Sequence, residues 1–180
     1  MDKTGPHVEV LFSAETIATR IDELATEISG RFADGLLVIA VLKGSFVFAA
    51  DLLRALHKAG LAPEVDFISL SSYRSGTSSL GSVEILRDIE SDVRGRDVLI
   101  IDDILESGRT LAYAKDLVAA RGARQILTCV LLDKPVRRAA TIRADFSAFP
   151  CPKVFVVGYG MDLAHRFREL PFVGHIPSLT

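Results

Sequence analysis

The sequence predicts an α/β fold in which helices flank a mostly parallel sheet. Short, continuous apolar runs, such as residues 36–42 and 126–132, are typical of strands that are buried on both faces. Between such runs, apolar residues recur every three or four positions, which is typical of helices with one buried face. Strands that alternate with helices pair mostly in parallel. At 180 residues the chain is long enough for one such domain, which we assign to residues 1–180.

The elements follow one another in a regular order. Ser13 is a suitable N-cap for the first helix, which carries an apolar stripe and ends near Gly30. The other predicted helices run from Gly44-Ser45 to about Gly60 and over residues 110–121. The predicted strands are residues 10–11, 36–42, 65–70, 83–86, 98–101, 126–132 and 154–157.

A polar segment, residues 71–82, separates two of these strands. It contains Gly76 and Gly81 together with several serines and threonines, so it cannot bury much apolar surface. One interpretation is a plain hairpin loop between the strands. The other is a mobile lid that closes over a binding site.

Charge and cysteine content narrow the classes of function. The formal net charge is −2 at pH 7, so no global basic field would recruit nucleic acid. The two cysteines, Cys129 and Cys151, have neither disulfide-framework nor zinc-site spacing, and Cys129 is expected in the core. No secretory h-region precedes residue 10, and no apolar run approaches the ~18 residues that span a membrane. We therefore expect a cytoplasmic protein without nucleic-acid or membrane partners.

Residues 98–111 carry the most functional information. An apolar strand, residues 98–101, runs into the adjacent acids Asp102 and Asp103, and a small-residue turn and a helix start follow. Backbone N–H groups of this turn and of the helix N-terminus can cradle a phosphate monoester. The two carboxylates can take ribose hydroxyls, directly or through a hydrated Mg²⁺. An ordinary solvated strand end is the alternative, and the full pattern favours a site for a phosphorylated sugar.

This stretch resembles the phosphoribosyl-pyrophosphate motif of the type I phosphoribosyltransferases. Further segments are similar, in order, to the hypoxanthine (hypoxanthine-guanine) phosphoribosyltransferase family: Leu42-Lys43-Gly44, Ser72-Tyr73, Lys134 in Leu-Leu-Asp-Lys-Pro, and the stretch 155–162. The resemblance covers residues 36–170 approximately. It implies a parallel sheet with a small hood region and a mobile lid loop, Mg²⁺ as cofactor, and a homodimer or homotetramer.

The resemblance also implies a role for each matching residue. The phosphoribosyl group would be held by Asp102, Asp103, Ser107, Gly108, Arg109 and Thr110. Pyrophosphate would be bound by Lys43, Gly44 and Arg168, with a cis peptide bond often found before the lysine. The purine would contact Lys134, Phe155, Val156 and Asp162, and the lid would include Ser72 and Tyr73. Mg²⁺ would be bound by Asp102, Asp103 and, for a second ion, Asp162.

The chain departs from the family pattern at the general base. The family has an aspartate three residues after the acid pair, and Glu106 stands there in this sequence. We expect Glu106 to take the proton that the purine loses; the alternative is that it points elsewhere and water moves the proton. Asp102 is a smaller departure, since many relatives carry glutamate there.

The implied reaction joins a 6-oxopurine base to 5-phosphoribosyl-1-pyrophosphate and releases pyrophosphate. A second enzyme reading is specificity for xanthine and guanine or for a pyrimidine, and the sequence does not choose between hypoxanthine and guanine. A regulator of the same fold, which binds nucleotides and then RNA or DNA, is disfavoured by the net charge and by the carboxylate at position 106. A generic phosphate-binding α/β protein is the least specific alternative.

Overall fold

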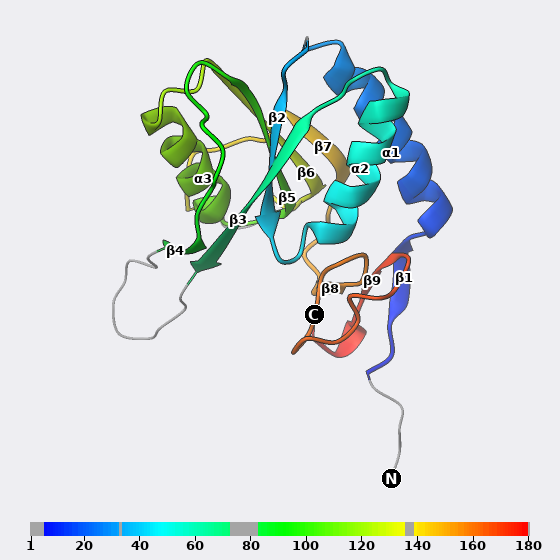
Figure 1. Ribbon diagram of the computed structural model, residues 1–180. Coiled ribbons are helices and arrows are strands. Elements are labelled where there is room, and N and C mark those ends of the chain that lie inside the picture. The colour runs from blue at the N-terminus through cyan, green and yellow to red at the C-terminus, as the bar shows by residue number, and fades with distance from the viewer. Residues whose placement is uncertain (1–5, 33, 73–82, 136–138, 180) are drawn as a thin grey trace.

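The main structural unit is a six-stranded sheet with helices on both faces (Figure 1). The computed structural model describes residues 6–32, 34–72, 83–135 and 139–179. In spatial order the strands are β4 (Val83–Arg87), β3 (Glu64–Ser72), β2 (Leu37–Leu42), β5 (Asp97–Leu105), β6 (Gln125–Asp133) and β7 (Phe146–Pro150). Within this sheet β4 runs antiparallel and the other strand pairs are parallel. The predicted α/β fold class is confirmed.

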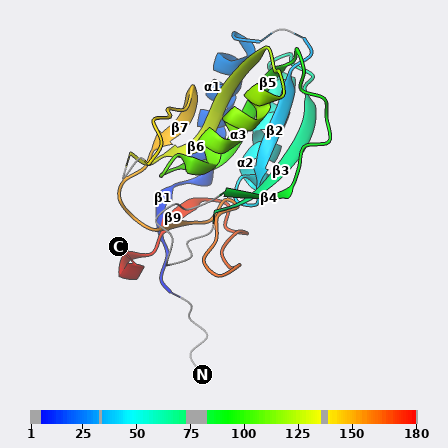
Figure 2. The same ribbon diagram turned by 90° about the vertical axis from the view of Figure 1, so that its left-hand side faces the viewer.

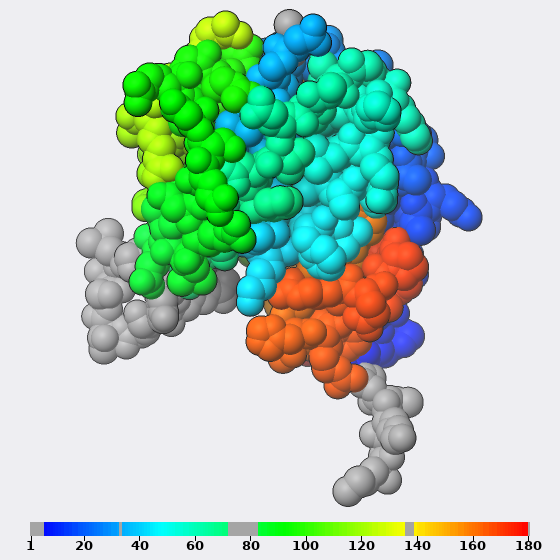
Figure 3. Space-filling view, in the orientation of Figure 1, coloured from blue at the N-terminus to red at the C-terminus, as the bar shows by residue number. Residues whose placement is uncertain are grey.

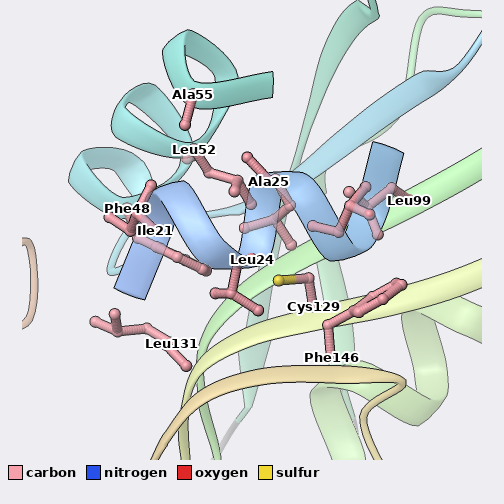
Figure 4. Close-up of a cluster of buried hydrophobic side chains, with 14 of the residues drawn as sticks. Ile21, Leu24, Ala25, Phe48, Leu52, Ala55, Leu99, Cys129, Leu131 and Phe146 are labelled. Carbon is pink, nitrogen blue, oxygen red and sulfur yellow. The ribbon is translucent and has the colours of Figure 1, made fainter. Parts of the chain in front are cut away.

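Within the described residues, three α-helices divide between the two faces of the sheet. Helices α1 (Ala14–Ser29) and α2 (Phe46–Lys58) pack together on one face, and α3 (Arg109–Ala120) covers the other (Figures 1 and 2). Figure 4 shows Leu24 of α1 and Leu52 of α2 pointing toward the sheet, where Cys129 lies fully buried. Burial of this kind is the main contribution to stability, and the prediction that Cys129 is a core residue is confirmed.

A smaller antiparallel sheet lies beyond the carboxyl ends of the parallel strands. Its order is β1 (Glu9–Phe12), β9 (Val173–His175) and β8 (Val156–Val157), so it joins segments from near both ends of the chain. A short 3₁₀ helix, η1 (Pro177–Leu179), follows β9. Figures 1 and 3 show the C-terminal segment packed below α2. We assign the small hood region implied by the resemblance to this sheet.

The structure corrects the predicted elements at four strands. The strand predicted over residues 98–101 continues as β5 to Leu105, so the acid pair lies inside the strand, because β6 continues to pair with it up to Leu105 and Asp133. Strands β7 and β9 were not predicted. The strand predicted over residues 154–157 is reduced to the two residues of β8. In the described part of the chain, no helix is long and apolar enough to cross a membrane.

Candidate active site

The acid pair near the end of β5 is the first element of the site. Asp102 is 6% exposed, and the backbone N–H of Asp103 donates to its Oδ1 at 2.9 Å. The N–H of Ile104 donates to Asp103 Oδ1 at 2.8 Å. Burial raises the pKa of both carboxyls, and the neighbouring Asp103 raises that of Asp102 further. Two buried carboxylates side by side favour the binding of a nearby cation, because the cation stabilises their charged forms.

The loop between β2 and α2 lies directly against this pair. The Leu42–Lys43 peptide bond is cis, as the resemblance implied. Ser45 is buried and its hydroxyl donates to the carbonyl of Val41 at 2.5 Å, which ties the loop to β2. A Cβ at Gly44 would lie 1.7 Å from Asp103 Oδ2, so only glycine allows this approach.

A C-terminal loop closes the same space from the other side. Arg168 forms an ion pair with Asp162, with 2.8 Å between Nη2 and Oδ1, and its Nη1 donates to the carbonyl of Gly160 at 2.6 Å. A cavity of about 280 Å³ is lined by residues that include Lys43, Gly44, Asp103, Asp162 and Arg168. Residues predicted from three separate segments of the chain thus meet at one cavity.

The turn between β5 and α3 forms the predicted phosphate loop. Gly108 has a φ of 80° and stands at the N-cap of α3, which begins at Arg109. The N–H of Arg109 donates to Ser107 Oγ at 3.4 Å. The Ser107 carbonyl accepts from the N–H groups of Ala139 and Ala140 at 2.9 and 3.2 Å, which fixes the turn. The first N–H groups of a helix have no intrahelical acceptor, and the helix dipole favours an anion there.

Glu106 and Lys134 lie side by side at the ends of β5 and β6. Lys134 Nζ lies 3.2 Å from Glu106 Oε1, with the lysine side chain 12% exposed and the glutamate 45% exposed. The backbone N–H of Lys134 also donates to the carbonyl of Leu105 at 3.0 Å. The predicted general base and the predicted purine-binding lysine therefore form an ion pair beside the phosphate loop.

Two other predicted purine residues, Phe155 and Val156, lie at the smaller sheet. Phe155 is 36% exposed, which is unusual for a core phenylalanine, and its carbonyl accepts from the N–H of Ile176 at 3.2 Å. The side chain of Val156 is buried, so only its backbone could meet a ligand. Ser72 ends β3, and Tyr73 lies outside the described residues, so the lid assignment stays a prediction.

Some residues around the cavity were not predicted from the sequence. Ser69 and Ser71 of β3 line it, and the backbone N–H of His165 donates to Asp162 Oδ2 at 2.7 Å. Ser69 and Ser71 lie two residues apart on β3, whose sequence is otherwise that of an ordinary strand. Their position at the cavity therefore depends on how β3 pairs in the sheet. The Gly-Tyr-Gly sequence at 158–160 lies within the stretch 155–162 that the resemblance to the family had already singled out.

Comparison with known proteins agrees with this geometry. Residues 7–163 match the family model described as the phosphoribosyl transferase domain. The chain is 42% identical over 172 residues to hypoxanthine phosphoribosyltransferase of Escherichia coli (strain K12), covering 94% of this chain and 95% of the relative. It is 45% identical over 167 residues to hypoxanthine-guanine phosphoribosyltransferase of Bacillus subtilis (strain 168), covering 92% and 91%.

A solved structure gives the same result for the fold. The crystal structure of a hypoxanthine phosphoribosyltransferase from Staphylococcus aureus superposes with a TM-score of 0.87 at 38% identity, covering 93% of this chain and 90% of that one. The sheet order, the strand-to-helix loops and the sequence match all point the same way. The chain belongs to the phosphoribosyltransferase family.

Proposed function

We propose that this protein is a purine salvage enzyme that transfers the 5-phosphoribosyl group from 5-phosphoribosyl-1-pyrophosphate to hypoxanthine or guanine. The products are pyrophosphate and IMP or GMP. The observation that carries the proposal is the Lys134–Glu106 ion pair beside the phosphate loop, because it sets a cation and a carboxylate where a base would meet the ribose. The names of the relatives, which are hypoxanthine and hypoxanthine-guanine phosphoribosyltransferases, support it.

Lys134 is proposed to select the base. Its ammonium group can donate to the 6-oxo oxygen of hypoxanthine or guanine, whereas the amino group of adenine offers donors at that position and is rejected. Phe155 would stack on the purine ring, which its exposed position supports. The backbone of Val156 would read the edge of the base, together with Asp162.

The phosphorylated sugar would extend across the carboxyl ends of the parallel strands. Its 5′-phosphate would bind the N–H groups of Ser107, Gly108, Arg109 and Thr110, and its ribose hydroxyls would bind Asp102 and Asp103. The pyrophosphate would occupy the cavity between Lys43 and Arg168. A guanidinium group suits phosphate oxygens because its donors are arranged as a planar fork.

Mg²⁺ is proposed to bind at Asp102 and Asp103. In the described residues no cluster of three or more His, Cys, Asp or Glu could hold a metal ion by itself. That fits Mg²⁺, which keeps several waters and takes one or two carboxylates together with substrate phosphates. Asp162 has one hydrogen-bond donor on each oxygen and retains lone pairs for a second ion. The metal would neutralise charge on the leaving pyrophosphate.

Glu106 is proposed as the general base. Its carboxylate is in contact with the lysine that would bind the purine oxygen, so a bound base would bring its ring nitrogen within reach of Glu106. The carboxylate would take the ring proton as the base attacks the ribosyl carbon. Closure of the 71–82 segment as a lid would exclude water from this step.

The proposal is tested by measuring pyrophosphate release from 5-phosphoribosyl-1-pyrophosphate with Mg²⁺, offering hypoxanthine, guanine, xanthine, adenine and uracil separately. We expect turnover with hypoxanthine, guanine or both, and none with adenine or uracil. Turnover with xanthine or uracil alone would contradict the base assignment. Nucleotide binding without turnover of any base would favour the alternative that the protein is a nucleotide-binding regulator of the same fold.

Replacing Lys134 with glutamine should lower kcat/KM for hypoxanthine by about 10- to 100-fold, since a hydrogen bond to a charged donor is worth about 1.5–3 kcal/mol. The matched control is Lys58→Gln, which removes the same charge from an exposed lysine on α2. Steady-state kinetics with varied hypoxanthine measure both. A variant at position 134 with unchanged kcat/KM would remove Lys134 from the purine site.

The cytoplasmic location and the homo-oligomeric state also remain proposals. Both cysteines are unpaired and buried, as in proteins of a reducing compartment. Phe46, Val65 and Phe67 are large apolar residues at 45%, 39% and 38% exposure, which favours contact with a second subunit. Light scattering of the purified protein should give the mass of a dimer or tetramer; a monomer at micromolar concentration would contradict this.

A further inference from the structure

Three consecutive residues of the C-terminal loop have an unusual backbone. Gly158, Tyr159 and Gly160 have φ angles of 90°, 50° and 99°. Glycine adopts such angles easily, but tyrosine does so only when its surroundings hold it there. A tyrosine between two glycines therefore points to a specific use of its side chain.

The Tyr159 side chain extends from this loop and contacts α2. The residue is 5% exposed and belongs to the core cluster that includes the α1 and α2 side chains. Its hydroxyl donates to Asp51 Oδ2, and the other oxygen of Asp51 pairs with Arg54. Burial raises the pKa of Tyr159, and the bond to Asp51 raises it further, so the phenol remains a proton donor at neutral pH.

Helix α2 is the element that follows the Lys43-Gly44 loop. The C-terminal loop touches that loop directly, because a Cβ at Gly160 would lie 2.4 Å from the carbonyl oxygen of Gly44. Gly160 is also joined to Arg168 in both directions, its N–H donating to the Arg168 carbonyl at 3.0 Å and its carbonyl accepting from Nη1 at 2.6 Å. These contacts connect Tyr159 to both cations that line the cavity, Lys43 and Arg168.

This connection has two branches. Along the C-terminal loop it runs from Tyr159 through Gly160 to Arg168. Along α2 it runs from Asp51 back to the helix start and to Lys43. Lys43 and Arg168 both line the cavity of about 280 Å³, so the bond between Tyr159 and Asp51 links the two segments that carry these cations.

We propose that Tyr159 is a positioning residue, whose hydrogen bond to Asp51 sets the spacing of Lys43 and Arg168 across the pyrophosphate cavity. The inference rests on the proposed pyrophosphate role of that cavity. Tyr159 would not touch the substrate. Its main effect would be on the leaving group, since Lys134 and Glu106, which are proposed to bind and deprotonate the purine, lie at the ends of other strands.

The test is the Tyr159→Phe variant of the full chain, which keeps the ring and removes the hydroxyl. We expect KM for 5-phosphoribosyl-1-pyrophosphate and the calorimetric Kd for pyrophosphate with Mg²⁺ to rise about 5- to 50-fold, because small misplacements of binding groups have large effects. KM for hypoxanthine should stay within about twofold of the wild-type value. This split separates positioning from a general loss of stability.

Two further variants control the result. Asp51→Asn keeps an oxygen that can accept from the Tyr159 hydroxyl and should retain most of the affinity for pyrophosphate. Asp51→Ala removes this acceptor and should reproduce the Tyr159→Phe effect. Tyr113→Phe makes the same chemical change on α3, on the opposite face of the sheet, and should leave both constants unchanged. The Asp51 variants also test the bond if Tyr159→Phe fails to fold.

The outcomes are distinct. A Tyr159→Phe variant with wild-type pyrophosphate affinity, or with both KM values raised equally, would overturn the positioning role. If the wild-type protein does not turn over any base but binds pyrophosphate, the inference is still tested by comparing the pyrophosphate Kd of the wild type with that of Tyr159→Phe. Absence of pyrophosphate binding to the wild type would overturn both the cavity assignment and the inference.

Discussion

Replacing Glu106 with glutamine is expected to lower kcat by about 10²- to 10⁴-fold, the range associated with loss of a general base. Glutamine has almost the same shape, and its amide oxygen can still meet Lys134, which lies 3.2 Å from the carboxylate in the structure. It cannot accept the purine proton. The loss should therefore appear in kcat at saturating concentrations of both substrates, measured by steady-state kinetics.

Glu106→Asp is the control for this variant. It keeps a carboxylate and shortens the side chain by one methylene group, so its kcat should exceed that of Glu106→Gln by about tenfold or more, because a general base is retained. If Glu106→Gln kept a near-normal kcat, proton transfer would have to pass through water or another group. Glu106 would then serve only to hold Lys134.

Replacing Gly44 with alanine is expected to lower kcat/KM for 5-phosphoribosyl-1-pyrophosphate by about 100-fold or more, because a misplacement of 1 Å in a binding site has that effect. The new Cβ would lie 1.7 Å from Asp103 Oδ2 and 2.7 Å from Asp103 Cγ. Either the carboxylate or the loop must move. The Asp103 carboxylate and the loop are both proposed to bind 5-phosphoribosyl-1-pyrophosphate. Displacing either of them therefore weakens the binding of this substrate.

Gly30→Ala is the matched control for the alanine at position 44. Gly30 has a φ of −73°, and a Cβ there would meet its nearest neighbour at an ordinary 3.6 Å. Gly44 is likewise outside the left-handed region, so backbone conformation does not distinguish the two sites. Kinetics and thermal unfolding of both variants should show a kinetic defect for Gly44→Ala alone. Wild-type kinetics in the Gly44→Ala variant would show that this cavity does not bind 5-phosphoribosyl-1-pyrophosphate.

The sequence was sufficient to predict the fold class and most elements, because apolar periodicity is a local property. It failed where pairing between distant segments decides the structure. The apolar run of β5 stops at Ile101, yet the strand continues to Leu105 because β6 supplies a partner for it. Strand β7 has the sequence Phe-Ser-Ala-Phe-Pro, which is short and ends in proline, so only its pairing with β6 identifies it.

The same limit applies to the candidate site. The motifs indicated which residue types should meet phosphate, ribose and base, and the Lys43, Asp103, Asp162 and Arg168 segments do come together. Contacts between segments were not predicted. The Glu106–Lys134 pair depends on the register in which Leu105 lies opposite Asp133.

The small sheet has a consequence for the ends of the chain. Its edge strands β1 and β8 both pair with β9, and Glu9 lies opposite His175, whose Nε2 is 3.3 Å from Glu9 Oε2. Phe155 and Val156, the proposed base-reading residues, are therefore supported by residues near both termini. A protease that trimmed either end past this sheet would remove this support for the base-reading residues before it reached any strand of the main sheet.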